Sequence, residues 1–507
     1  MKVLFVSLGC DKNLVDSEHM LGALYEKGFA LTDDEDEAEA AVINTCCFIE
    51  DAQKESIEEI LALAERRTAG QLKALIVTGC MAQRYREEIL KEIPEVDAVV
   101  SLKAEDGIAE TLEKVLGGSI SNRFVDGPGG SAEVGSAGVN KAGVGSAGNS
   151  DAGVEDSCLG SADAGKAKTE QTGTSQAPAS DDLQPALFEK NDLHTALFDQ
   201  KGPNPEQLDQ KGLHSALYDK KRILTTGGGY GYLKIAEGCD KHCTYCVIPS
   251  IRGPYRSVPM EKLLEQAKEL AEQGVRELIL VAQETTLYGK DLYGEKKLPE
   301  LLRRLSEIQG IEWIRILYCY PEEITEELLY TIRDLPKVVH YLDIPIQHAA
   351  DSILKKMGRR TNRKELEETI ALIREILPDV CIRTTLITGF PGEREEDHRE
   401  LMDFVKRMKF DRLGVFTYSK EEGTPAARIS IQIPMRIKKK RRKELMLLQQ
   451  DIAFEAARAM KGRELEAIVE GKLVDEDVYV ARTYKDAPGV DGSLFIETKR
   501  ELMSGDL

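Results

Sequence analysis

The sequence predicts an α/β protein with two parallel-sheet domains and a small carboxy-terminal β-domain. Short apolar strands alternate with amphipathic helices over residues 1–122, and the same alternation returns over 225–433. Short strand-like segments with Gly and Pro turns then follow within 434–507. Alternating strands and helices form parallel sheets with right-handed crossovers. The 42% hydrophobic and 31% charged content of this 507-residue chain is typical of a globular protein with a substantial core.

The amino-terminal domain is predicted to contain four short buried strands and at least one helix that faces a core. Ile57, Ile60, Leu61 and Ala64 recur at the spacing of one helix face. The strands are expected at residues 3–8, 41–45, 74–78 and 98–100. This order of elements predicts a parallel α/β domain over residues 1–122.

Residues 123–224 differ from the rest of the chain in composition. Gly, Ala, Ser and Asp dominate the first part, so burial cannot offset the entropy of ordering it, and a disordered insertion is predicted. Short Leu-Ala-Leu-aromatic repeats at 183–190, 193–201 and 213–221 are interpreted as a duplication rather than as partner-docking sites. Cys158 lies alone in this segment and is interpreted as a bystander.

The second domain, residues 225–433, is predicted to be a partial barrel of six β/α units. Helices are expected at 262–272 and 395–407. Strands are expected at 232–237, 277–282, 313–318, 341–346, 382–387 and 414–418. Active sites of such barrels lie at the carboxyl ends of the strands.

The carboxy-terminal region, residues 434–507, is predicted to begin with one helix at 435–461. Its basic run at 436–443 is interpreted as a solvated face, with contact to RNA phosphate as the alternative. The segment 462–507 is predicted to form a small β-domain.

The strongest functional signal is the C-x3-C-x2-C spacing of Cys239, Cys243 and Cys246. Three thiolates on an irregular loop can wrap an iron–sulfur cluster and leave one iron open to a substrate. A zinc site with His242 as fourth ligand is the alternative, although zinc sites more often have paired CxxC or Cys/His sets. The spacing favours an iron–sulfur centre.

A second set of cysteines follows three successive strands of the amino-terminal domain. Cys10, Cys46 and Cys80 each lie just past a predicted strand. Ligands of parallel sheets bind outside the carboxyl ends of the strands, so these thiols are expected to meet at one edge and to hold a second cluster. A single buried Cys is often only a small apolar residue. That interpretation is kept for Cys47, Cys319 and Cys381.

Together these features resemble the methylthiotransferase family of radical S-adenosylmethionine (SAM) enzymes, over nearly the whole chain except the insertion. Both cysteine sets match the family position by position, and further similar stretches lie at 282–289, 341–348, 412–418, 421–425 and 481–492. The resemblance implies a radical-SAM partial (β/α)6 barrel and a TRAM-like β-domain. That β-domain is expected to be incomplete, because the family's domain usually continues for at least one more strand.

The resemblance also implies two four-iron, four-sulfur clusters, and SAM as radical source and methyl donor. It places the SAM amino group near Gln283 and Glu284, and the adenosine near Gly389 and Glu393, where a turn that caps a helix is an equally good interpretation. No catalytic acid or base is assigned, because radical transfer needs none. His348 is weighed as a residue that faces the site, against an ordinary structural histidine.

Two substrates compete within the family: an aspartate β-carbon of the small-subunit ribosomal protein S-twelve, and adenosine in transfer RNA. The stretches at 282–289 and 481–492 favour the ribosomal-protein branch. An electron donor such as flavodoxin or ferredoxin is expected, and the sequence identifies no sulfur donor. The alternatives from other classes are a two-cluster electron-transfer protein, a radical-SAM enzyme whose extra cluster only relays electrons, and an inactive RNA- or ribosome-binding protein.

Composition narrows the classes of protein further. The net charge of −20 disfavours a general nucleic-acid binder and suits a basic partner. Residues 1–10 are interpreted as a first strand rather than a leader, and no apolar run has transmembrane length. With ten Cys grouped by spacing rather than paired, a reduced cytoplasmic protein without membrane contact is expected.

Overall fold

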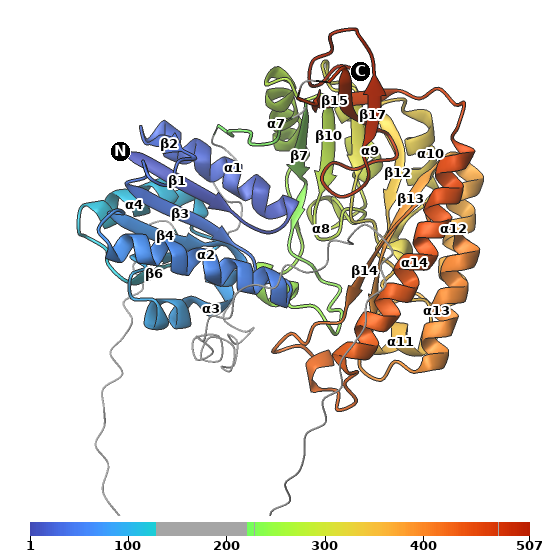
Figure 1. Cartoon of the computed structure of the whole chain (residues 1–507), viewed down its shortest axis with the longest axis horizontal. Coiled ribbons are helices and arrows are strands. Elements are labelled where there is room, and N and C mark those ends of the chain that lie inside the picture. Colours follow the sequence, from blue (N-terminus) through green and yellow to red (C-terminus); the bar gives the residue numbers. More distant parts are fainter. Residues whose placement is uncertain (128–220, 228, 475) are drawn as a thin grey trace, which may run out of the picture. The chain divides into compact units, whose positions relative to one another are not determined.

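The computed structural model describes residues 1–127, 221–227, 229–474 and 476–507 (Figure 1). The predicted insertion, with its repeats and Cys158, falls almost wholly on 128–220 and so lies outside the described residues.

The amino-terminal sheet has six parallel strands in the order β2-β1-β3-β4-β5-β6. The four predicted strands are confirmed to within one residue at each end, because each is a run of mostly apolar residues. Two three-residue strands, β2 and β6, were not predicted, and β6 takes the first residues of the segment that composition assigned to the insertion. The bounds are β1 (Lys2–Ser7), β2 (Ala30–Thr32), β3 (Ala40–Thr45), β4 (Ala74–Thr78), β5 (Ala98–Val100) and β6 (Arg123–Val125).

Helices connect these strands and bury apolar residues against the sheet. Apolar residues of α1 and α4 form one buried cluster with alternate residues of the strands. The predicted helix around Ile57 and Ile60 is confirmed as α2, and both side chains are buried. The bounds are α1 (Asp11–Glu26), α2 (Glu50–Thr68), α3 (Gly79–Glu92), the short 3-10 helix η1 (Glu105–Gly107) and α4 (Ile108–Leu116).

The central domain contains a six-stranded parallel sheet in the order β14-β13-β12-β11-β10-β7. Neighbouring strands follow one another along the chain, as the winding of a (β/α) barrel requires. All six predicted strands are present. However, β12 begins and ends three residues early, because Ile344 and Ile346 remain buried after the strand has ended. The bounds are β7 (Tyr230–Lys234), β10 (Glu277–Val281), β11 (Trp313–Ile316), β12 (Val338–Asp343), β13 (Cys381–Thr388) and β14 (Arg412–Thr417).

Helices alternate with these strands, and both predicted barrel helices are confirmed as α7 and α13. The main helices are α7 (Met260–Glu272), α9 (Leu298–Ser306), α10 (Glu326–Asp334), α12 (Arg363–Ile376) and α13 (Glu395–Met408). Shorter elements are the hairpin of β8 (Ala236–Glu237) and β9 (Arg256–Ser257), with α6 (Ile248–Arg252), α8 (Lys290–Tyr293), η4 (Pro321–Glu323), α11 (Asp351–Lys356) and η5 (Ala426–Arg428).

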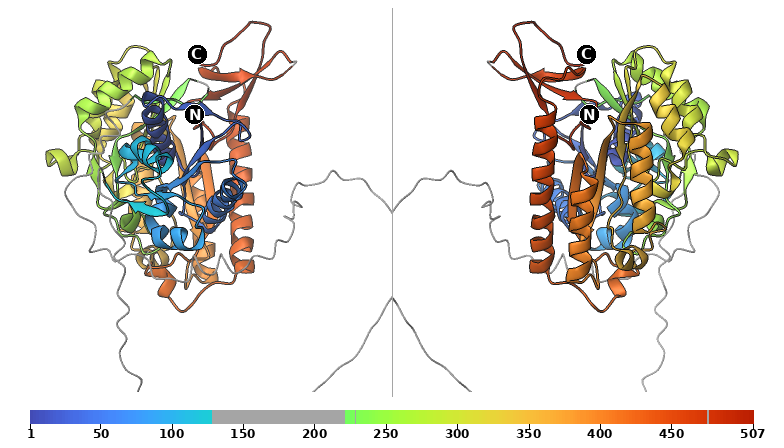
Figure 2. Two further views of the ribbon diagram at one scale, coloured as in Figure 1. Left: turned by 90° about the vertical axis from the view of Figure 1, so that its left-hand side faces the viewer. Right: turned by 90° about the vertical axis from the view of Figure 1, so that its right-hand side faces the viewer.

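The last segment contains α14 (Met435–Ala459) and an antiparallel sheet of β15 (Ala467–Lys472), β16 (Val478–Thr483) and β17 (Leu494–Glu497). The predicted single helix is confirmed, and it packs beside α13 (Figure 2). The solvated face predicted for the basic run holds for most of its cations, but Lys438 and Arg441 are buried. In the part of the chain that the structure describes, no helix is long and apolar enough to cross a membrane.

Candidate functional site

The first cysteine set lies in the loop between β8 and α6, at the carboxyl edge of the barrel sheet. Cys239 and Cys243 are buried, and Cys246 is partly exposed. The amide of Cys239 donates to the carbonyl of Gly253 at 3.1 Å, and that of Cys246 donates to the carbonyl of Cys243 at 3.0 Å. These bonds curl the loop back on itself and bring its thiols close enough to interact electrostatically.

The electrostatics of this loop reflect burial and mutual proximity of the thiols. Burial raises the pKa of Cys239 to about 11 and that of Cys246 to about 12. The nearby Cys243 contributes to both increases in pKa, and Cys239 contributes to that of Cys246. Metal coordination removes the proton from a thiol, so these neutral thiols become ligands only when a cation arrives.

Two buried cations lie at the loop: Lys241 within it and Arg359 beside it. Lys241 is buried and forms ion pairs with Glu323 at 2.6 Å and Glu322 at 3.2 Å. Arg359 is buried, and its Nη1 lies 3.9 Å from the Sγ of Cys243. Positive charge next to thiols favours their ionised form, as cluster ligation requires.

The carboxyl end of β10 brings Gln283 and Glu284 to the same edge. Burial raises the pKa of Glu284 to about 7, although the nearby Lys241 opposes this effect. The Oε1 of Gln283 and the Oε2 of Glu284 are buried and receive no hydrogen bond from any described residue. Lys241 Nζ approaches Glu284 Oε2 only to 3.6 Å, which is beyond hydrogen-bonding distance. Two unsatisfied acceptors therefore fit a ligand with N–H donors, such as the ammonium group of SAM.

Gly389 and Glu393, predicted near the adenosine, both contact α14. The Glu393 carboxylate accepts hydrogen bonds from the amides of Gly389 and Phe390, and it pairs with Arg441 at 3.1 Å. A Cβ at Gly389 would overlap the side chain of Lys438. These contacts fit the helix-capping interpretation, and contact with adenosine stays a prediction.

His348 is fully buried, and its Nδ1 accepts the amide hydrogen of Ala350 at 3.0 Å. Burial lowers the pKa of His348 to about 3, so the ring is neutral. Its Nε2 is also buried and has no hydrogen-bond partner among the described residues, so contact of His348 with a ligand stays a prediction beside the structural interpretation.

The second cysteine set lies at the carboxyl edge of the amino-terminal sheet. Cys10 precedes α1 directly after β1, Cys46 follows β3, and Cys80 lies in the first turn of α3 after β4. The order β2-β1-β3 reverses direction at β1, which makes the β1/β3 edge a topological switch point. Ligands of open α/β sheets bind at such points.

Glycine makes the close approach of these residues possible. Gly9 has φ +96°, and a Cβ there would lie 2.7 Å from the Cβ and 2.9 Å from the Sγ of Cys46. Gly79 has φ +93°, and a Cβ there would overlap Asn44 and Thr45. Only glycine has both the conformation and the size for these positions.

The three thiols of this set are electrostatically coupled. Burial raises the pKa of Cys80 to about 12; Arg252 lowers it, and the neighbouring Cys10 and Cys46 raise it. Burial also raises the pKa of Cys46, with Cys10 acting in the same direction. Burial holds the pKa of Cys47 well above its usual range, as expected for an inert neighbour.

The donor atoms of both triads are thiols, which are the usual ligands of iron–sulfur clusters. Over the described ranges, no three His, Cys, Asp or Glu side chains gather closely enough to hold one metal ion. A cubane takes one thiolate at each of several corners, so its ligands surround a volume rather than a point. Each triad offers three thiols, which leaves one iron of such a cluster without a protein ligand.

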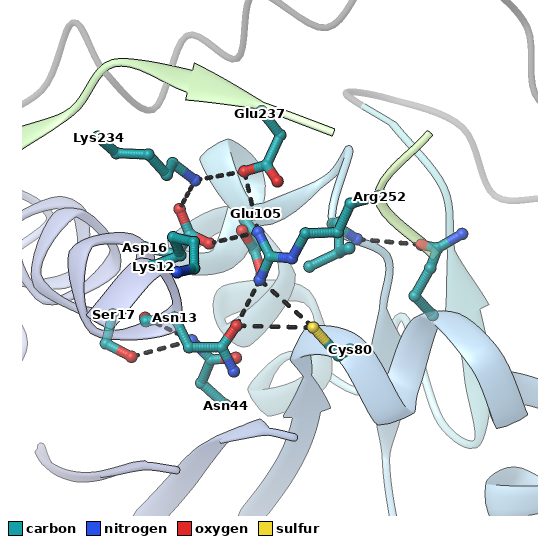
Figure 3. A network of polar contacts seen from close by, with 12 residues as sticks. Lys12, Asn13, Asp16, Ser17, Asn44, Cys80, Glu105, Lys234, Glu237 and Arg252 are labelled. Atoms are coloured by element: carbon teal, nitrogen blue, oxygen red, sulfur yellow. Dashed lines mark hydrogen bonds and ion pairs between the residues drawn. The ribbon is translucent and has the colours of Figure 1, made fainter. Parts of the chain in front are cut away.

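Sequence reasoning did not find the buried ionic network that links Cys80 to Lys234 and Arg252, on either side of the barrel cysteine loop (Figure 3). Arg252 of α6 donates to Asp16 at 3.1 Å and to Glu237 at 2.9 Å, and Lys234 pairs with the same two carboxylates. Arg252 also lies 3.4 Å from the Sγ of Cys80. The available signal was the position of Lys234 and Arg252, which bracket the cysteine loop in the sequence.

Three known families match separate parts of this chain. Residues 2–101 match Uncharacterized protein family UPF0004, residues 233–405 match the Radical SAM superfamily, and residues 462–507 match the TRAM domain. Among solved structures, the chain is similar to the radical S-adenosylmethionine methyltransferase TsrM from Kitasatospora setae. The TM-score is 0.49 with 15% identity, over 82% of this chain and 72% of that one.

Curated relatives match over the full length. The chain is 51% identical to "Ribosomal protein uS12 methylthiotransferase RimO" of Lachnoclostridium phytofermentans, over 100% of this chain and 96% of the relative. It is 43% identical to the protein of the same name from Acetivibrio thermocellus, over 100% of this chain and 94% of the relative.

Proposed function

Because this chain belongs to the ribosomal protein uS12 methylthiotransferase RimO family, we propose that it transfers a methylthio group to uS12. The acceptor is the β-carbon of an aspartate, and the enzyme is a radical-SAM sulfurtransferase. The single observation that carries this proposal is the pair of cysteine triads on a chain that matches such relatives from end to end. The formal charge of −20 agrees with a basic protein substrate.

The proposed cofactors are two four-iron, four-sulfur clusters and SAM. Cys239, Cys243 and Cys246 would hold the cluster that binds SAM. The second set, Cys10, Cys46 and Cys80, would hold the cluster that carries sulfur. When bound, this pair of clusters and SAM supplies radical hydrogen abstraction, sulfur donation and methyl transfer.

The protein's own residues orient and shield these groups. The buried acceptors of Gln283 and Glu284 would receive the SAM ammonium group at the end of β10. Lys241 pairs with Glu323 at 2.6 Å and lies 3.6 Å from Glu284, so it offsets part of the negative charge of these carboxylates. Four of the proposed ligands are buried, which limits the access of water and protects reactive species from side reactions. These are Cys46, Cys80, Cys239 and Cys243.

The proposed partners are uS12 as substrate and a low-potential electron donor of the flavodoxin or ferredoxin class. The cytoplasm is the proposed site of action, since it contains both ribosomal proteins and a reducing milieu.

One experiment distinguishes the proposed function from methylthiolation of transfer RNA and from electron transfer. Anaerobically reconstituted enzyme is incubated with SAM, dithionite, and either uS12 or unmodified transfer RNA. The proposal expects 5′-deoxyadenosine together with methylthiolated uS12. Methylthiolated adenosine instead would move the activity to transfer RNA. Absence of 5′-deoxyadenosine from cluster-loaded enzyme would favour a two-cluster electron-transfer protein.

A further inference from the structure

Each cysteine triad has one thiol that lies beside a buried arginine. The Nη2 of Arg252 lies 3.4 Å from the Sγ of Cys80, in the amino-terminal set. The Nη1 of Arg359 lies 3.9 Å from the Sγ of Cys243, in the barrel set. The exposed fractions of these two arginines are 6% and 8%, so neither guanidinium is simply a solvated surface charge.

We propose that Arg252 is a positioning residue for the amino-terminal cluster: it hydrogen bonds the Cys80 thiolate, raises the cluster's reduction potential and fixes its place relative to the SAM site. This inference rests on the proposed cluster ligands. Hydrogen bonds to cluster sulfurs and nearby charge are among the factors that set cluster potentials.

The local structure aims this guanidinium at Cys80. Arg252 ends the short helix α6, which begins two residues after Cys246. Its Nη1 is held by Asp16 at 3.1 Å and by Glu237 at 2.9 Å. The other nitrogen, Nη2, donates to the amide oxygen of Asn13 and to Cys80 (Figure 3).

The charges around Arg252 explain why its loss would change the reduction potential of the amino-terminal cluster. Arg252 and Lys234 carry two positive charges, and they face the two carboxylates of Asp16 and Glu237. The carboxyl of Glu105 lies in the same network, and burial raises its pKa well above the usual range. Removal of the Arg252 charge would leave this buried group and the Cys80 thiolate with more negative charge. The added electron of a reduced cluster would then be less favourable, because like charges repel strongly where water is excluded.

Glu237 extends the contact to the SAM site. Its Oε1 accepts a hydrogen bond from the Nε2 of Gln283 at 2.9 Å, and its Oε2 accepts from Arg252. A continuous chain of side chains therefore runs from the end of β10, through Glu237 and Arg252, to Cys80. This series of contacts fixes the position of the two cluster sites relative to each other, and both must act on one substrate.

The test uses two full-length parent variants, each with one cluster. One parent has Cys239, Cys243 and Cys246 changed to Ala and keeps only the amino-terminal set. The other has Cys10, Cys46 and Cys80 changed to Ala and keeps only the barrel set. Arg252→Gln, Arg252→Lys and the matched control Arg359→Gln are introduced into both. The reduction potential of the remaining cluster is measured by redox titration, with electron paramagnetic resonance used to detect the reduced form.

In the first parent, Arg252→Gln is expected to lower the ratio of reduced to oxidised cluster about tenfold at fixed potential. For one electron, this corresponds to a downward shift of about 59 mV. Arg252→Lys keeps the charge but loses the forked donor geometry, so it is expected to lower the potential by a smaller, measurable amount. Arg359→Gln is expected to leave the potential unchanged. In the second parent, Arg359→Gln should lower the potential and Arg252→Gln should not.

The outcomes separate the inference from the proposed function. If the first parent binds no iron, the ligand assignment of Cys10, Cys46 and Cys80 is wrong. If it holds a cluster whose potential stays the same in Arg252→Gln, Arg252 is only a structural link and the inference is overturned. If Arg252→Gln binds too little iron to titrate, Arg252→Lys is titrated in its place. A reduction potential of the amino-terminal cluster equal to that of the first parent then overturns the inference.

Discussion

Glu277→Gln is expected to loosen the attachment of the carboxy-terminal β-domain to the barrel. Glu277 begins β10, and its two carboxylate oxygens each accept a hydrogen bond at 2.6 Å, from Arg315 and from Arg482. The three side chains are at most 2% exposed. Glutamine keeps the volume but leaves two buried guanidinium groups without this counter-charge. Removing one partner from a buried ion pair costs about 3–5 kcal/mol.

Glu470→Gln is the matched control, because Glu470 contacts the same Arg482 at 2.5 Å but is 25% exposed. A more exposed pair contributes about 0–1 kcal/mol. Global unfolding of a chain with several domains is not a two-state transition, so local hydrogen exchange is the suitable assay. Amides of β15 and β16 are expected to exchange on the order of 100-fold faster in Glu277→Gln, since about 1.4 kcal/mol corresponds to tenfold. Equal exchange in the two variants would refute this reasoning.

Three further predictions concern pH and cluster loading. Burial lowers the pKa of His348 from 6.5 in the unfolded chain to about 3 in the folded protein. The free energy of unfolding therefore keeps its full value above pH 6.5 and decreases as the pH falls toward 3. Between about pH 7.5 and 5.5 this decrease is about 1.4 kcal/mol. His348→Asn should remove that share of the pH dependence from the free energy of local opening, measured by hydrogen exchange of the amides around residue 348, and an unchanged pH dependence would contradict it. Gly9→Ala should lower the amount of iron bound by the amino-terminal set about twofold or more. The control Gly28→Ala should not, because Gly28 has a similar φ of +85° but no neighbour within 4 Å. Equal iron content in the two variants would count against the close packing at Cys46. Cys47→Ser should keep the iron content of the unchanged protein while Cys46→Ser loses part of it, and the reverse order would show that the ligand is Cys47.

Most of the fold could be predicted because its strands are continuous apolar runs. The runs at 74–78 and 98–100 end where their strands end. By contrast, β2 and β6 have three residues each with one polar residue among them, are not fully buried, and are held by pairing with β1 and β5. Periodicity along the chain carries no information on such pairing.

The position of both cysteine sets at the carboxyl edges of the sheets could be predicted, because the spacing of one set is local and each member of the other follows a strand. The roles of Arg252 and Arg441 could not. Both look like solvated charges in the sequence, and only packing places them against Cys80 and Glu393. The position of Arg252 beside the cysteine loop was a signal, but its contact with Cys80, 172 residues away along the chain, could not be read from a single sequence.

Mass spectrometry of uS12 from cells with and without this gene tests the proposed function most directly. The expected result is one methylthio group on an aspartate of uS12 that disappears when the gene is deleted. It should return with the intact gene, but not with a copy in which Cys239, Cys243 and Cys246 are changed to Ala. An unchanged mass of uS12 in the deletion strain, or loss of a methylthio group from transfer RNA adenosine instead, would contradict the proposal.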